Sequence, residues 1–109
     1  MPPIVSFVEH LSLLRCSGDE DRATQGCRRQ ALSRALRAPN DVVVDLSELS
    51  FADVSLMLDL ATLAGRLRRR NRSLLLRDAP PHILRLIELV GVDRLPGVRL
   101  ARGAAPMLT

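Results

Sequence analysis

A junction between an apolar strand and a long apolar helix constrains the fold more than any other part of the chain. Val42–Leu46 has the apolar, β-branched composition of a buried strand, and residues 47–52 are expected to form a short polar bend. Asp53 then precedes a helix that begins at Val54-Ser55. The first N–H groups of a helix lack partners and its dipole favours negative charge, so Asp53 is the expected cap. The segment therefore predicts a helix start that presents an acid and a hydroxyl together.

Apolar periodicity and turn residues predict the remaining elements. The expected strands are Ile4–Val8 and Leu11–Cys16, paired as a hairpin, then 42–46, 73–77 and 98–100, and the expected helices are 22–37, 54–70 and a third from Pro80-Pro81 to the C-cap Gly91. Residues 17–21 are expected to form a turn before the first helix. The order ββαβαβαβ predicts an α/β fold with a mixed, mostly parallel sheet, an antiparallel N-terminal hairpin and three main helices.

The two longer helices have distinct faces. On the first, Ala31 and Ala35 fall on the apolar face, and the other face is expected to carry Arg28, Arg29, Arg34 and Arg37. On the second, the polar residues Ser55, Asp59, Thr62 and Arg66 form one narrow stripe. Its apolar residues form two rows, of which one must face the sheet: Leu56, Leu60, Leu63 and Leu67, beside Val54, Met57, Leu58, Ala61 and Ala64. The other is either an exposed patch for a partner or core beneath the third helix.

Composition limits the classes of function. The 109 residues are expected to form one domain, 1–109, with 101–109 as a frayed tail. The net charge of +4 comes from arginine alone, and only two residues are aromatic. The run from Arg66 to Arg72 lacks aromatic residues and a recognition-helix pattern, so no nucleic-acid partner is expected. No apolar run approaches ~20 residues and no signal peptide is apparent, so a cytoplasmic protein without membrane insertion is expected.

The sequence offers no catalytic or metal-binding constellation. Cys16 and Cys27 lack metal-ligand spacing, and the two histidines, His10 and His82, are far apart. There is no nucleophile elbow and no Gly-rich phosphate loop. We expect neither an enzyme nor a cofactor. The cysteines are expected to be small core residues, and a regulatory disulfide between them is the alternative.

Four segments in order resemble the STAS domain, the fold of bacterial anti-sigma factor antagonists. They are Ser17-Gly18-Asp19-Glu20-Asp21 before the first helix, Val43-Val44-Asp45-Leu46-Ser47 followed by Phe51-Ala52-Asp53, Ser73-Leu74-Leu75-Leu76, and Leu86–Leu95. The resemblance covers nearly the whole chain. It implies a protein-interaction module that binds through the start of the second helix and through the turn at Asp21.

The chain departs from the family at the position where phosphorylation is expected. The family's phosphoacceptor hydroxyl directly follows the acid, and here that position is Val54, which has no hydroxyl. Ser55 stands one residue later, about 100° further round the helix. The family's two helix glycines are replaced by Leu56 and Leu58. Phosphorylation is therefore expected at Ser55 or not at all.

The leading interpretation is an anti-sigma factor antagonist, a monomer or weak homodimer, that binds an anti-sigma factor of the ATPase-kinase type. The expected contact residues are Asp21, Asp53, Val54, Ser55, Leu56 and Asp59. Stand-alone STAS domains similar to this one also bind transporter ATPases, so an accessory subunit of an ABC-type lipid transporter is the alternative. A ligand-sensing STAS domain is a third possibility and would need a cavity.

Overall fold

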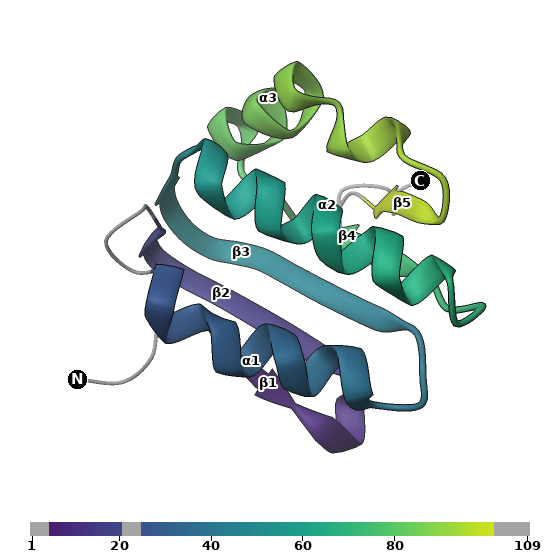
Figure 1. Ribbon diagram of the computed structural model, residues 1–109. Helices are drawn as coiled ribbons and strands as arrows, with labels where there is room; N and C mark the ends of the chain where they lie inside the picture. Colours follow the sequence, from purple (N-terminus) through teal and green to yellow (C-terminus); the bar gives the residue numbers. More distant parts are fainter. Residues whose placement is uncertain (1–4, 21–24, 102–109) are drawn as a thin grey trace, which may run out of the picture.

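A five-stranded sheet with strand order β1-β2-β3-β4-β5 forms the centre of the protein (Figure 1). The computed structural model describes residues 5–20 and 25–101. β1 runs antiparallel to β2, and all other neighbouring strands are parallel. The strands are β1 (Val5–Val8), β2 (Leu13–Glu20), β3 (Val42–Ala52), β4 (Leu74–Arg77) and β5 (Val98–Ala101). The predicted mixed, mostly parallel sheet with an antiparallel edge is confirmed.

Helices connect the parallel strands. They are α1 (Gln25–Arg37), α2 (Val54–Arg68) and α3 (Pro81–Val90), with short 3₁₀ helices η1 (Glu9–Leu11) and η3 (Val92–Arg94). Right-handed crossovers that all step in one direction place their helices on one face of a sheet. Figure 1 accordingly shows α1 and α2 side by side over the sheet, with α3 beyond α2. The predicted order ββαβαβαβ is confirmed.

The core lies between the sheet and these helices. Successive side chains of a strand point to opposite faces, so alternate residues of the strands are buried beneath the helices. The fully buried residues include Val42, Val44 and Leu46 of β3, Leu76 of β4, and Leu56, Leu60 and Leu67 of α2. Burying one such side chain stabilises the fold by about 1.5–3 kcal/mol. The leucine row of α2 is therefore core, because Leu56, Leu60, Leu63 and Leu67 are all buried. In the other apolar row, Met57 and Ala64 are also buried, whereas Val54 and Leu58 are exposed.

The predicted bend before Asp53 is wrong, because β3 continues to Ala52. The predicted turn at 17–21 is likewise wrong for residues 17–20, which belong to β2. The two strands pair beyond the expected limits, and Glu20 lies opposite Ala52. Shifts of register after Arg15 and Gly18 accommodate this extension. Asp53 therefore follows directly from a hydrogen-bonded strand.

Other boundaries differ by a few residues. Leu11 belongs to η1 because Ser12, at φ 49°, turns the chain before β2 begins. Gly91 ends α3 in the left-handed conformation, at φ 89°, as predicted. Ala101 belongs to β5, and the remainder of the predicted tail lies outside the described residues. Cys16 is a buried core residue, while the side chain of Cys27 lies outside the described part of the chain.

Candidate functional site

Asp53 caps the start of α2, as predicted. Its backbone is extended, at φ −109° and ψ −176°, and its carboxylate accepts the N–H of Ser55 at 2.9 Å. The same Oδ1 atom accepts the hydroxyl of Ser55. Caps of this kind satisfy an unpaired first-turn N–H, and an acid there is favoured by the helix dipole.

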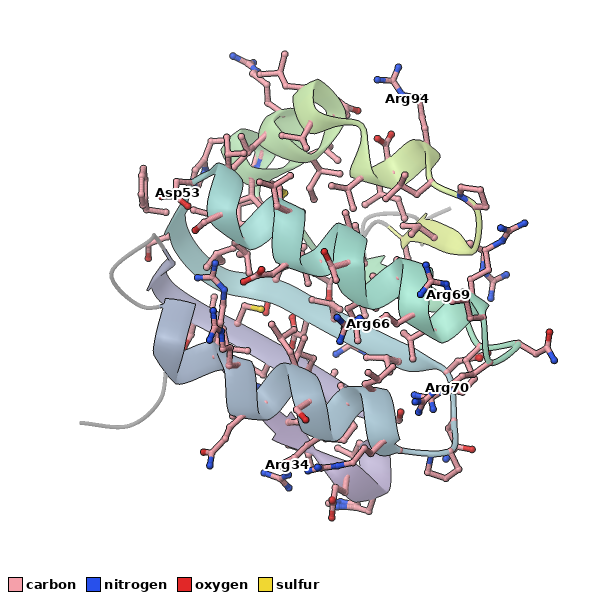
Figure 2. All side chains as sticks on the ribbon, viewed as in Figure 1. Arg34, Asp53, Arg66, Arg69, Arg70 and Arg94 are labelled. Carbon is pink, nitrogen blue, oxygen red and sulfur yellow. The ribbon has the colours of Figure 1, made fainter. Side chains whose placement is uncertain are left out.

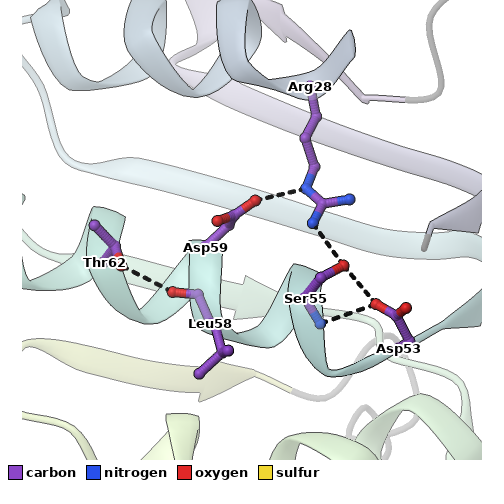
Figure 3. A network of polar contacts seen from close by, with 6 residues as sticks. All are labelled: Arg28, Asp53, Ser55, Leu58, Asp59 and Thr62. Carbon is purple, nitrogen blue, oxygen red and sulfur yellow. Dashed lines mark hydrogen bonds and ion pairs between the residues drawn. The ribbon is translucent and has the colours of Figure 1, made fainter. Parts of the chain in front are cut away.

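Arg28 of α1 completes this arrangement, and the prediction that it lies on the helix face away from the apolar residues is wrong. Its side chain is fully buried, and its Nε donates to Oδ2 of Asp59 at 2.8 Å. Its Nη2 donates to the hydroxyl of Ser55 at 2.9 Å (Figure 3). We call Arg28, Asp53, Ser55 and Asp59 the bracket, because they join α1 to the start of α2. Burial of Arg28 is tolerable since the guanidinium is paired and hydrogen-bonded.

The spacing of two polar residues on α2 indicates part of the bracket from the sequence alone. Ser55 and Asp59 lie four residues apart on a largely apolar helix, so they share one side of it. That side faces α1 rather than solvent, because α1 and α2 pack side by side. A half-buried acid there needs a cation, and Arg28 supplies it.

The hydroxyl of Ser55 both accepts and donates a hydrogen bond. It accepts from Arg28 and donates to Asp53. A phosphoryl group on this oxygen would remove the donated hydrogen and place negative charge beside the Asp53 carboxylate. The geometry therefore favours a structural role for Ser55.

The predicted contact residues divide into four groups. Asp53, Val54 and Ser55 lie together at the helix start, with Val54 exposed. Asp59 lies one turn later and its side chain is 23 % exposed, partnered by Arg28. Leu56 is fully buried, so its predicted place on a contact surface is wrong: it points from α2 into the core. Asp21 lies outside the described residues.

Three exposed apolar side chains lie close together in the sequence where β3 ends and α2 begins. The described part of the chain exposes five large apolar residues, and three of them are Phe51, Val54 and Leu58. We call these three the junction patch. Val54 and Leu58 are four residues apart on α2 and share one face. Exposed apolar surface of this kind marks a candidate protein-binding site.

A groove between α1 and α2 continues from the bracket. Its volume is about 370 Å³, and Leu32, Leu36 and Leu63 contribute apolar lining. Arg29 and Arg66 line it from opposite helices, together with Asp59 and Thr62. Three of the four residues in the predicted polar stripe of α2, Asp59, Thr62 and Arg66, thus line this groove.

Part of the arginine run has a structural role. Arg72 donates to the carbonyl oxygens of Ala35 and Leu36 at 2.8 and 2.9 Å, and Arg70 donates to that of Leu36 at 3.2 Å. These carbonyls belong to the last turn of α1, where they lack helical partners. Figure 2 shows Arg70 near this end of α1. Burial lowers the pKa of the Arg72 guanidinium below its usual value.

Within residues 5–20 and 25–101, no group of three or more histidine, cysteine or acidic side chains could hold a metal ion. No helix in the same ranges is both long and apolar enough to cross a membrane.

Comparison with known proteins agrees with this architecture. No curated protein matches the chain. The fold is similar to the 1.59 Å crystal structure of a Thermotoga maritima protein provisionally described as an anti-sigma factor antagonist. The TM-score is 0.71 and the identity 12 %, over 89 % of this chain and 83 % of that one. A family model described as Mlab, STAS domain, matches residues 5–100. The chain therefore belongs to the STAS domain family.

Proposed function

We propose that this STAS domain is an anti-sigma factor antagonist that binds an anti-sigma factor of the ATPase-kinase type in the cytoplasm. The observation that carries the proposal is the start of α2, where the junction patch lies beside the capped Asp53. The proposed contacts are Asp53, Val54, Ser55, Asp59 and the exposed Leu58. The bracket supports this assignment, because it holds the contact surface in one arrangement before the partner arrives.

The proposed antagonist works without a phosphorylation switch. Val54 offers no hydroxyl at the position where the resemblance to the family expects one. The neighbouring hydroxyl of Ser55 is engaged by Arg28 and Asp53. Release of the sigma factor would then depend on the amount of this protein relative to its partner, and not on its phosphorylation state.

A second candidate keeps the same surface and changes the partner to the ATPase subunit of an ABC-type lipid transporter. The loss of the hydroxyl at Val54 favours it, because a permanent subunit needs no phosphorylation cycle. The two candidates differ in which purified ATPase the chain binds.

The experiment is a calorimetric titration of the chain against both kinds of ATPase from the source organism. The anti-sigma candidate predicts binding to the kinase, and Leu58→Asp is expected to weaken it at least about tenfold by placing a charge in an apolar contact. Leu89→Asp is the matched control, since Leu89 is 77 % exposed on α3. Binding to the transporter ATPase alone would select the second candidate. Binding that Leu58→Asp leaves unchanged would reject the proposed surface for both.

Incubation with the kinase and ATP, followed by mass spectrometry, tests the missing switch. No phosphate is expected on the wild-type chain. Stoichiometric phosphate on Ser55 would show that the switch has moved by one residue, and phosphate on another residue would remove the start of α2 from the regulatory mechanism.

A further inference from the structure

A second concave surface lies away from the junction patch, at the far end of α2. It is a pocket of about 460 Å³ between the last turns of α2 and the segment that leads into β5. Its lining combines cationic and apolar groups: Arg68, Arg69, Asn71, Gly65, Ala61, Leu95 and Pro96. No carboxylate belongs to this lining. Pockets of this volume are typical of sites for small molecules.

The two arginines of the pocket differ from their neighbours in the same run. The side chains of Arg70 and Arg72 donate hydrogen bonds to carbonyl oxygens of α1. Within the described part of the chain, neither Arg68 nor Arg69 has a side-chain hydrogen bond or ion pair. Figure 2 shows Arg69 at this end of α2, on the side toward β5. Their charges are thus available to a ligand.

The surroundings position one of these side chains. The Cβ, Cγ and Cδ atoms of Arg68 pass beside Gly97, each 3.8 Å from the place where a Cβ of Gly97 would lie. Gly97 has φ +81°, a conformation that glycine adopts at little cost. The stem of Arg68 is therefore packed against this turn while its side chain lines the pocket.

The negative end of the α2 dipole does not oppose an anion strongly here. The carbonyl oxygens of Gly65, Leu67 and Arg68 accept backbone N–H groups from residues 69–72. Their partial charges are thus already compensated by local hydrogen bonds.

We propose that this pocket binds a phosphate monoester. Arg68 and Arg69 would hold the phosphate oxygens, because guanidinium groups form short, charge-assisted and often bidentate bonds to phosphate. The apolar surface of Leu95 and Pro96 would contact the organic part of the ligand. The phosphate group could belong to a free small molecule or to a lipid headgroup.

The probes are inorganic phosphate, phenyl phosphate, and phosphatidic acid vesicles with phosphatidylcholine vesicles as the blank. Amide shifts of Gly65, Asn71 and Gly97 in ¹H–¹⁵N spectra report on the pocket. Phenyl phosphate is expected to bind more tightly than inorganic phosphate. The double variant R68A/R69A is expected to weaken binding about tenfold or more. R29A/R37A removes the same charge elsewhere and should leave binding within about twofold, since both of its arginines are exposed on α1.

Gly65 permits a second variant that blocks the pocket without removing charge. Nothing lies within 4 Å of a Cβ added at Gly65, so G65L should fold and fill the pocket. It is expected to abolish phenyl phosphate binding, while G65A retains it. Vesicle binding lost in R68A/R69A, with no binding of phenyl phosphate, would assign the site to a lipid headgroup. Absence of binding to every probe, or binding that survives both R68A/R69A and G65L, would overturn the proposal.

Discussion

Arg28 and Asp59 join α1 to α2 through a bond of 2.8 Å between the guanidinium Nε and the carboxylate Oδ2. The arginine side chain is 0 % exposed and that of the acid 23 %. A buried charge of this kind is stable only while it is paired. Because the same guanidinium also donates to Ser55, one side chain of α1 is bonded to two positions in the first turns of α2.

Replacement of Arg28 by alanine is expected to destabilise the fold by about 3 kcal/mol, because it leaves Asp59 without its cation and opens a cavity. Arg28→Lys should recover only part of this loss, since an ammonium cannot reproduce the guanidinium fork that reaches both Asp59 and Ser55. Urea denaturation followed by circular dichroism measures both effects. The matched control is Arg29→Ala, an exposed neighbour whose loss should cost less than about 0.5 kcal/mol. Equal stability of the two alanine variants would contradict the role given to Arg28.

The alternation of strands and helices, the Asp53 cap and the Gly91 C-cap could be predicted from the sequence, because each depends on local periodicity or on one backbone conformation. The burial of Arg28 could not be predicted from the sequence. It arises from the contact between two helices that are separated by β3. The spacing of Ser55 and Asp59 indicates a polar side of α2, but it does not show which arginine of α1 lies against it. The extension of β3 to Ala52 depends in the same way on a neighbouring strand, since pairing with β2 continues through the residues that the sequence predicts to form a bend.

Replacement of Asp53 by alanine should cost about 1 kcal/mol, because the first turn of α2 loses the acceptor for the Ser55 N–H. Asp53→Asn keeps an acceptor oxygen and should cost only a few tenths of that. Thermal unfolding of the three proteins at pH 7 gives the comparison. A loss for Asp53→Asn as large as that for Asp53→Ala would indicate that the charge near Arg28, and not the cap, is the stabilising feature.

Arg72→Ala should destabilise the fold by about 1–2 kcal/mol, because two carbonyl oxygens at the end of α1 lose charged donors. Arg70→Ala should cost clearly less, since the Leu36 oxygen that it contacts keeps its bond from Arg72. Amide exchange in the last turn of α1 distinguishes a local from a global effect: protection there should fall in Arg72→Ala more than in Arg70→Ala. The reverse order would exclude the capping role of Arg72.

Asp45 of β3 should make the fold sensitive to acid. Burial raises the pKa of its carboxyl, but the hydrogen bonds from Ser47 and the charge of Arg77 outweigh this, so the pKa lies below 3.8. A pKa that is lower in the folded state adds stability above the unfolded value, and this is lost as the pH falls through the folded value. The difference in melting temperature between wild type and Asp45→Asn should therefore be largest near pH 7 and shrink below about pH 4. Glu48→Gln, an exposed change on the same strand, is the control, and a difference that grows on acidification would have the wrong sign.

The Val54→Ser variant tests whether the missing hydroxyl at this position is the feature that prevents phosphorylation. The change restores a hydroxyl directly after Asp53, and because Val54 is 48 % exposed it should alter stability by less than about 0.5 kcal/mol. If the partner is an ATPase-kinase, it should phosphorylate the introduced hydroxyl, and the added charge beside Asp53 should weaken the complex at least about tenfold. Mass spectrometry after incubation with ATP, followed by titration of the modified chain, measures both steps. Val54→Thr should behave likewise, whereas Val54→Ala should bind but accept no phosphate. A Val54→Ser variant that binds the kinase yet stays unmodified would show that the leucines at 56 and 58, and not the missing hydroxyl alone, prevent phosphorylation.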